Sequence, residues 1–191
     1  DGMPWYFTRD HPGRNLCRTG KLHLASCVTA SAAAPTFFDP WRVEDVGTLV
    51  DGGLGVTGNP VYQACVEAFL FSPDYDPADA TVVSLGTGQF LDREHPHWIG
   101  SWLNWIIGDL MKSPGEEQTE LVARHYSEAQ FFRMDPKLTK DVAMDNPGGI
   151  GWLLEEATRF AASVDWPSIL DGSSTRFRIG PDNTMPSQYA A

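Results

Sequence analysis

The stretch from Thr48 to Leu54, Thr-Leu-Val-Asp-Gly-Gly-Leu, decides how the rest of the chain is interpreted. Thr48 to Val50 is a short β-prone run, and it ends in Asp51 followed by Gly52 and Gly53. The two glycines permit backbone angles that a side chain would forbid, so the pattern predicts a strand that delivers Asp51 onto a tight turn. Taken alone, such an aspartate is typical of a turn that it shapes by hydrogen bonding to nearby backbone.

Helix signals lie on both sides of this turn. Upstream, the run of small and apolar residues from His23 predicts a buried helix that stops at Pro35, because the residue before a proline is pushed out of helical angles. Downstream, Asn59 followed by Pro60 is a strong helix start, in which the asparagine caps and the proline stands where no amide hydrogen is needed. This second helix should run to about Phe71.

Strands and helices alternate along the remainder of the chain. Thr81 to Leu85 is a compact apolar run that leads into a glycine turn, Gly86 to Gly88, as buried parallel strands do. The other predicted elements are strands at Met3–Thr8, Gln130–Met134 and Thr175–Ile179, and helices at His97–Lys112, Glu116–Glu128 and Ile150–Val164. The alternation predicts an α/β fold.

Composition bounds the class of protein. The chain has 191 residues, which fits one domain with one packed core; we expect residues 1–180 to form it and residues 181–191 to be a loosely held tail. With 42% apolar and 20% charged residues it is too hydrophobic for intrinsic disorder, and no apolar run is long enough for a membrane span. Fourteen Lys and Arg against 25 Asp and Glu give a net charge of −11, which disfavours nucleic acid as a partner. The composition indicates a soluble globular chain.

Cysteine and histidine usage favours neither disulfides nor metal. Cys17, Cys27 and Cys65 are an odd number without a C-x-x-C pair, which favours reduced thiols and a cytoplasmic compartment. The histidines include a pair at i, i+2 but none at the i, i+4 spacing of a helical metal site, so we expect no metal. The first residue is Asp1 and no signal segment follows it, so we expect a fragment or a processed chain.

Four separated motifs occur in an order that resembles the patatin-like phospholipase family. They are Ala-Ser-Ala-Ala-Ala-Pro-Thr-Phe-Phe (Ala30–Phe38), Leu-Val-Asp-Gly-Gly-Leu (Leu49–Leu54), Asn-Pro-Val (Asn59–Val61) and Val-Ser-Leu-Gly-Thr-Gly (Val83–Gly88). The later stretch from Gln130 to Asn146 is also similar to the tail of the family, and the resemblance covers roughly Lys21 to Phe160.

The resemblance implies a three-layer α/β/α fold and a lipid acyl hydrolase. Acyl esters of phospholipids or related lipids would be cleaved by a serine and aspartate pair through an acyl-serine intermediate, without a cofactor. The resemblance places the aspartate at Asp51, on the turn that Gly52 and Gly53 shape. A carboxylate is a weak base for a serine hydroxyl, so it must lie within hydrogen-bond reach, on a rigid turn, in a partly dry pocket.

The chain departs from the family in two places. The family's nucleophile lies in G-x-S-x-G upstream of D-G-G, and that motif does not occur in these 191 residues. We therefore expect the serine to come from an amino-terminal segment, in the same or another chain, and the 191 residues alone to be an inactive, amino-terminally incomplete part of the sheet. The second departure is Gly55 to Gly58, where a shorter link to the helix start is more usual.

The helix predicted at His97–Lys112 has two interpretations. Its tryptophans Trp98, Trp102 and Trp105 lie on one broad apolar side, as in a helix that packs into a core. They would also suit contacts with an acyl chain or a lipid interface. Lys112 is its one basic residue, so we expect at most peripheral membrane contact.

Two other functions stay open at this point. A phosphotransferase of the actin and sugar-kinase type would use Asp51 to orient magnesium and the Leu85–Gly88 turn to hold the phosphate of a nucleotide. A non-catalytic interaction domain would explain the missing nucleophile. Ser31 is a poor substitute for that nucleophile, because a serine inside a helix of small residues commonly bonds back to the preceding turn.

Overall fold

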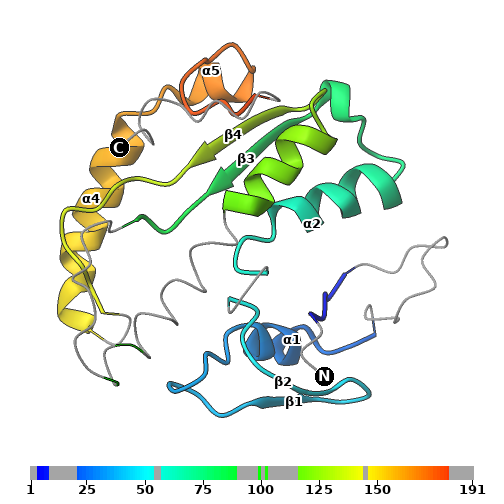
Figure 1. Cartoon of the computed structure of the whole chain (residues 1–191), viewed down its shortest axis with the longest axis vertical. Coiled ribbons are helices and arrows are strands. Elements are labelled where there is room, and N and C mark those ends of the chain that lie inside the picture. Colours follow the sequence, from blue (N-terminus) through cyan, green and yellow to red (C-terminus); the bar gives the residue numbers. More distant parts are fainter. Residues whose placement is uncertain are drawn as a thin grey trace. The chain divides into compact units, whose positions relative to one another are not determined.

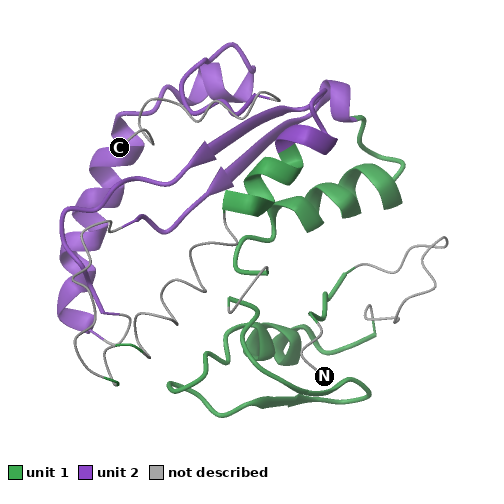
Figure 2. Cartoon of the chain, in the orientation of Figure 1, with its two compact units in different colours: residues 1–76, 96–122 green, residues 77–95, 123–191 purple. Residues whose placement is uncertain are grey.

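The computed structural model describes residues 4–8, 21–53, 57–89, 99, 102, 116–143 and 146–180 (Figure 1). The chain divides into two compact units, each described by itself below (Figure 2). Unit 1 comprises residues 1–76 and 96–122, and unit 2 comprises residues 77–95 and 123–191.

Unit 1 contains the helix α1 and a short hairpin. Helix α1 (Leu24–Ser31) confirms the helix predicted from His23, and Cys27 and Ala30 are its buried residues. It ends before Pro35, because Ala32 already leaves helical angles at φ −108° and ψ 7°. The small side chains of α1 let it lie close to the hairpin that follows.

The hairpin pairs β1 (Trp41–Val43) with β2 (Gly47–Leu49) in antiparallel register, with Trp41 opposite Leu49 and Val43 opposite Gly47. Asp45 in its turn and Gly47 at the start of β2 have positive φ of 62° and 127°. Aspartate tolerates that region better than most residues and glycine adopts it without strain, so the sequence suits the turn. The strand predicted at Thr48–Val50 is confirmed as β2, shifted by one residue.

The helix predicted from Asn59 is also confirmed. It consists of α2 (Val61–Cys65), continued by a π-helical segment over Val66–Phe71. The Oδ1 atom of Asn59 accepts a hydrogen bond from the Val61 N–H at 3.3 Å, as a capping side chain does, although Pro60 occupies the N-cap position itself. The π-helical form was not predicted, since its hydrophobic pattern over six residues differs little from that of an α-helix.

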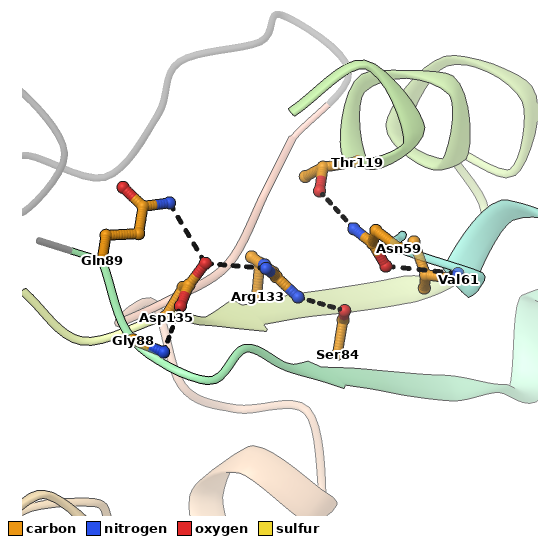
Figure 3. Close-up of polar contacts among 8 residues, drawn as sticks. All are labelled: Asn59, Val61, Ser84, Gly88, Gln89, Thr119, Arg133 and Asp135. Atoms are coloured by element: carbon orange, nitrogen blue, oxygen red, sulfur yellow. Dashed lines mark hydrogen bonds and ion pairs between the residues drawn. The ribbon is translucent and has the colours of Figure 1, made fainter. Parts of the chain in front are cut away.

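A further helical segment runs from residue 116 to 125 and confirms the helix predicted at Glu116–Glu128, three residues shorter. It buries Thr119 and Val122 almost completely. The Thr119 Oγ1 accepts a hydrogen bond from the Nδ2 of Asn59 at 3.4 Å, so Asn59 also contacts the part of this helix that belongs to unit 1 (Figure 3).

Unit 2 is built on a pair of parallel strands. Strands β3 (Thr81–Leu85) and β4 (Gln130–Met134) are hydrogen-bonded in register, from Thr81 opposite Gln130 to Leu85 opposite Met134. Two helices follow, α4 (Ile150–Ala162) and α5 (Trp166–Leu170). Parallel pairing and following helices are the expected form of an α/β unit.

The core of unit 2 lies between β4 and these helices. Its buried members are Phe132, Met134, Val164, Ile169 and Phe177, with Val83 and Phe160 packed against them. Phe160 and Phe177 meet edge to face, with ring centroids 5.7 Å apart. Helix α4 begins after a 3₁₀ turn at Pro147–Gly149, where the Oδ1 of Asn146 accepts a hydrogen bond from the Gly148 N–H at 3.0 Å.

Several expectations about strands were wrong. Residues 4–8 contain no strand. Thr175–Ile179 forms a single bridge, between Arg178 and Phe132, because Phe177 has a positive φ of 66° that interrupts an extended run. The strand β3 is less buried than predicted, since it pairs on one side with β4 and its Leu85 is 65% exposed.

The described strands form two separate two-stranded sheets, β1 with β2 and β3 with β4. The mixed α/β content is therefore confirmed, and in the part of the chain that the structure describes no helix is long and apolar enough to cross a membrane. The helix predicted at His97–Lys112 lies outside the described residues except for Ile99 and Trp102, which are helical. The tail at 181–191 also lies outside them, and the one-domain organisation stays a prediction.

Candidate functional site

The candidate base Asp51 follows strand β2 by two residues and lies in unit 1. Its half-buried side chain turns back on the chain, and its Oδ1 accepts a hydrogen bond from the Gly53 N–H at 2.7 Å. This is the local turn that an aspartate followed by two glycines predicts. A Cβ on Gly53 would stand 3.1 Å from that Oδ1, so a larger residue would crowd the carboxylate.

Two further hydrogen bonds fix the turn. The Asp51 N–H donates to the carbonyl of Ala33, just beyond helix α1, at 3.0 Å. The Thr57 hydroxyl donates to the carbonyl of Gly52 and so bridges the turn to the chain that follows residues 54–56. The backbone that carries Asp51 is therefore held from both sides, which is the rigidity that a positioned base requires.

Among the described residues, none pairs with the second carboxylate oxygen of Asp51. Its Oδ1 is engaged by Gly53, and no described residue donates a hydrogen bond to its Oδ2. An oxygen of this kind can accept a proton from a hydroxyl brought within about 3 Å. The turn geometry agrees with the prediction, while the catalytic role of Asp51, Gly52 and Gly53 stays a prediction.

A second polar cluster lies in unit 2, at the carboxyl ends of β3 and β4 (Figure 3). Asp135 is only 9% exposed and accepts hydrogen bonds from the Gly88 N–H at 2.9 Å, from the Gln89 Nε2 at 3.1 Å and from the Arg133 Nη2 at 2.8 Å. The Arg133 Nη1 donates to the Ser84 Oγ at 2.9 Å. A buried ion pair thus ties the end of β4 to the turn after β3.

The turn after β3 is shaped around this ion pair. A Cβ on Gly86 would stand 2.2 Å from the carboxylate of Asp135, so only glycine fits there. Gly88 has a positive φ of 96°, and a Cβ there would stand 2.8 Å from Leu138. The N–H groups of Gly86 and Gln89 donate to the carbonyls of Met134 and Pro136 at 2.7 and 2.8 Å.

These contacts disfavour a phosphate site at Leu85–Gly88. A phosphate cradle needs backbone N–H groups directed at the ligand, whereas those of Gly86 and Gly88 are directed at the protein itself. The neighbouring Asp135 is an anion, which would also repel phosphate. Sequence reasoning gave no role to Arg133 and Asp135; the signal that could have found them is one charged residue inside, and another directly after, an otherwise apolar strand.

The described thiols are poor nucleophile candidates. Cys27 and Cys65 are both free and buried. Burial raises the pKa of the Cys65 thiol to about 11, so the reactive thiolate is scarce at neutral pH.

The three tryptophans predicted to contact an acyl chain are only partly described. Trp98 and Trp105 lie outside the described residues. Trp102 is helical and 47% exposed, and its contact with substrate stays a prediction.

Comparison with known proteins gives one partial similarity. The chain is 34% identical over 90 residues to a protein of Escherichia coli (strain TW11681) described as a cGAMP-activated phospholipase. The match covers 45% of this chain and 25% of the relative, so the chain matches about a quarter of that protein's length. Neither protein-family profiles nor solved structures give a match. The similarity supports a relationship to lipid hydrolases.

Proposed function

We propose that these residues belong to a lipid acyl hydrolase, a phospholipase A-like esterase that uses a serine and aspartate dyad with Asp51 as general base. The observation that carries the proposal is the partial similarity to a phospholipase, in a chain whose D-G-G aspartate is held on a rigid turn and has one carboxylate oxygen to which no described residue donates.

In the proposed reaction a serine hydroxyl from a segment outside these 191 residues approaches Asp51. The carboxylate accepts the hydroxyl proton while the serine oxygen attacks the carbonyl carbon of the acyl ester. The ester C–O bond breaks, the alcohol leaves with the proton, and water then hydrolyses the acyl-serine by the same steps. A base positioned in this way contributes about 10²- to 10⁴-fold to the rate.

Asp51 suits this role better than the other strand-end aspartate. Asp135 accepts hydrogen bonds from the Gly88 N–H, the Gln89 amide and the Arg133 guanidinium, so both of its oxygens are already engaged. Asp51 accepts a hydrogen bond from the Gly53 N–H at 2.7 Å and lies on a glycine turn that no described cation touches.

The proposed architecture is a three-layer α/β/α sheet of the patatin-like kind, to which this chain contributes the carboxyl-terminal part. The parallel pairing of β3 and β4 and the helices that follow β4 support it. Trp102, with Trp98 and Trp105, would line the path of the acyl chain. Gly86 and Gly88 then act as structural residues of the turn, because their N–H groups are already used.

The proposal is tested by phospholipid hydrolysis. The product of the complete open reading frame that encodes these residues should hydrolyse dispersed phosphatidylcholine and be inactivated by a serine-reactive fluorophosphonate. The 191-residue chain should do neither, because a base without its nucleophile cannot form an acyl-enzyme. Fluorophosphonate-sensitive turnover by the 191 residues would place the nucleophile inside them, and no turnover by either protein would favour the interaction-domain alternative.

A further inference from the structure

The peptide unit between Gly52 and Gly53 is hydrogen-bonded at both of its ends. Its carbonyl oxygen, on Gly52, accepts a hydrogen bond from the Thr57 hydroxyl. Its N–H, on Gly53, donates to the Asp51 Oδ1 at 2.7 Å. A single peptide unit therefore connects the Thr57 side chain to the carboxylate of the candidate base.

The two glycines leave room for the side chains on either side of this peptide unit. A Cβ on Gly52 would stand 3.3 Å from the Thr57 Oγ1 and 3.7 Å from the Thr57 Cβ, so the threonine side chain packs directly against Gly52. A Cβ on Gly53 would stand 3.1 Å from the Asp51 Oδ1. Thr57 and Asp51 thus each occupy the space that a side chain on the neighbouring glycine would need.

A peptide unit between two glycines turns over more easily than others, because glycine adopts positive and negative φ about equally well. The peptide group is planar, so its C=O and its N–H rotate together. Rotation of the Gly52–Gly53 unit would withdraw the Gly53 N–H from Asp51 and bring a carbonyl oxygen toward the carboxylate. The Thr57 hydroxyl opposes that rotation, because it holds the carbonyl end of the unit.

The chain that carries Thr57 is anchored in the interior of unit 1. Two residues later, Asn59 is only 7% exposed. Its side chain accepts from the Val61 N–H at 3.3 Å and donates to the Thr119 Oγ1 at 3.4 Å (Figure 3). Thr57 therefore links the turn of Asp51 to a buried and hydrogen-bonded asparagine.

We propose that Thr57 is a positioning residue for the general base: its hydroxyl holds the Gly52–Gly53 peptide unit so that the Gly53 N–H orients the Asp51 carboxylate. The inference rests on the proposed function, in which the orientation of this carboxylate determines how well it accepts the proton of the serine. Thr57 lies in the Gly55–Gly58 link, where the sequence departs from the family that it resembles, so the family pattern does not assign this contact.

The test removes the hydroxyl while keeping the shape of the side chain. Thr57→Val lacks the hydroxyl, and Thr57→Ser keeps it. Thr57→Ala also lacks it but needs less room, so it gives the same readout if valine disturbs folding. The matched control is Thr29→Val, since the Thr29 hydroxyl also donates to a backbone carbonyl, that of Ala25 in α1 of the same unit, at 2.8 Å. All variants are made in the complete reading-frame product, and the melting temperature of each is measured.

The first readout is the hydrolysis of phosphatidylcholine. We expect kcat to fall about 3- to 10-fold in Thr57→Val and Thr57→Ala, the factor that corresponds to one net hydrogen bond. KM should stay unchanged, because the contact acts on proton transfer and not on substrate binding. In Thr57→Ser and Thr29→Val, kcat should stay within about twofold of the unsubstituted value.

The second readout is hydrogen exchange at the Gly53 N–H, which does not depend on turnover. Exchange should be at least about threefold faster in Thr57→Val, because the peptide unit is no longer held at its carbonyl end. It should stay near the unsubstituted rate in Thr57→Ser and in Thr29→Val.

The inference requires both readouts to change in Thr57→Val. Either a kcat within about twofold of the unsubstituted value or an unchanged Gly53 exchange rate would overturn it. An equally large fall of kcat in Thr57→Ser would also overturn it, because the effect would then come from packing. A raised KM with unchanged kcat would overturn it as well, because Thr57 would then contact the substrate.

Failure of the positioning role and failure of the proposed function are distinguishable. If the complete product hydrolyses phosphatidylcholine and Thr57→Val changes neither readout, the positioning role alone is wrong. If the complete product has no hydrolase activity while Gly53 exchange responds to Thr57→Val, the proposed function is wrong, and with it the role of this contact in catalysis.

Discussion

Replacing Asp135 by Asn should destabilise unit 2 strongly, although the two side chains have nearly the same shape. The remaining oxygen can still accept from the Gly88 N–H, but the new amide group faces the Arg133 guanidinium, and both are donors. Breaking one side of a buried ion pair costs about 3 to 5 kcal/mol. The Arg133 side chain is 15% exposed and keeps its bond to Ser84. We therefore expect the loss of unfolding free energy to lie at the lower end of this range, about 3 kcal/mol.

A second ion pair in the same unit provides the control. Arg159 and Glu156 on α4 are joined by the same distance, 2.8 Å, but the arginine side chain is 69% exposed. Exposed pairs of this kind contribute about 0 to 1 kcal/mol, so Glu156→Gln should change little.

Urea unfolding of the complete reading-frame product, followed by tryptophan fluorescence, gives the change in unfolding free energy for each of the two variants, Asp135→Asn and Glu156→Gln. Hydrogen exchange at the Gly88 N–H gives a local readout, and Asp135→Asn should accelerate it while Glu156→Gln should not. If Asp135→Asn lowers the unfolding free energy no more than Glu156→Gln does, the buried ion pair does not hold the turn after β3.

The remaining predictions concern packing and pH. Phe132→Ala should cost about 3 to 5 kcal/mol in the same urea assay, because the ring is fully buried in the unit 2 core; a cost below about 1 kcal/mol would contradict that packing. The Cys65 thiol should make stability fall as pH rises from about 9 to 11, since the unfolded chain ionises there while the folded thiol, with its pKa raised to about 11, stays protonated. Cys65→Ala should remove that part of the pH dependence, and an unchanged slope in urea titrations across this range would show that the thiol is not its source.

Local signals predicted the elements that depend on neighbouring residues. The turn at Asp51 follows from one aspartate and two glycines, and the cap of α2 follows from Asn59 and Pro60, because each contact spans only two residues. The two strands of unit 2, Thr81–Leu85 and Gln130–Met134, were also predicted from their own residues, although their pairing with each other was not. Such patterns are carried by the chain itself and need no partner far away in the sequence.

Contacts between distant residues could not be predicted in the same way. The cluster of Asp135 depends on Gly88 and Gln89, 47 and 46 residues away, so no local pattern reveals it. Strand β1 has three residues, Trp-Arg-Val, which is too short for an alternation to be recognised. The low burial of β3 depends on the strands that lie beside it, and the apolar run alone does not predict these neighbours.

The central claim, that Asp51 is the general base, is tested most directly by the turnover of Asp51→Asn in the complete reading-frame product. Asparagine can keep the bond from the Gly53 N–H, so the melting temperature should change little. The control is Asp39→Asn, at an exposed acidic position of the same unit. We predict that phosphatidylcholine turnover falls roughly a hundredfold or more in Asp51→Asn and stays near the unsubstituted level in Asp39→Asn. An Asp51→Asn protein of unchanged stability that retained more than about a third of the turnover would contradict the account.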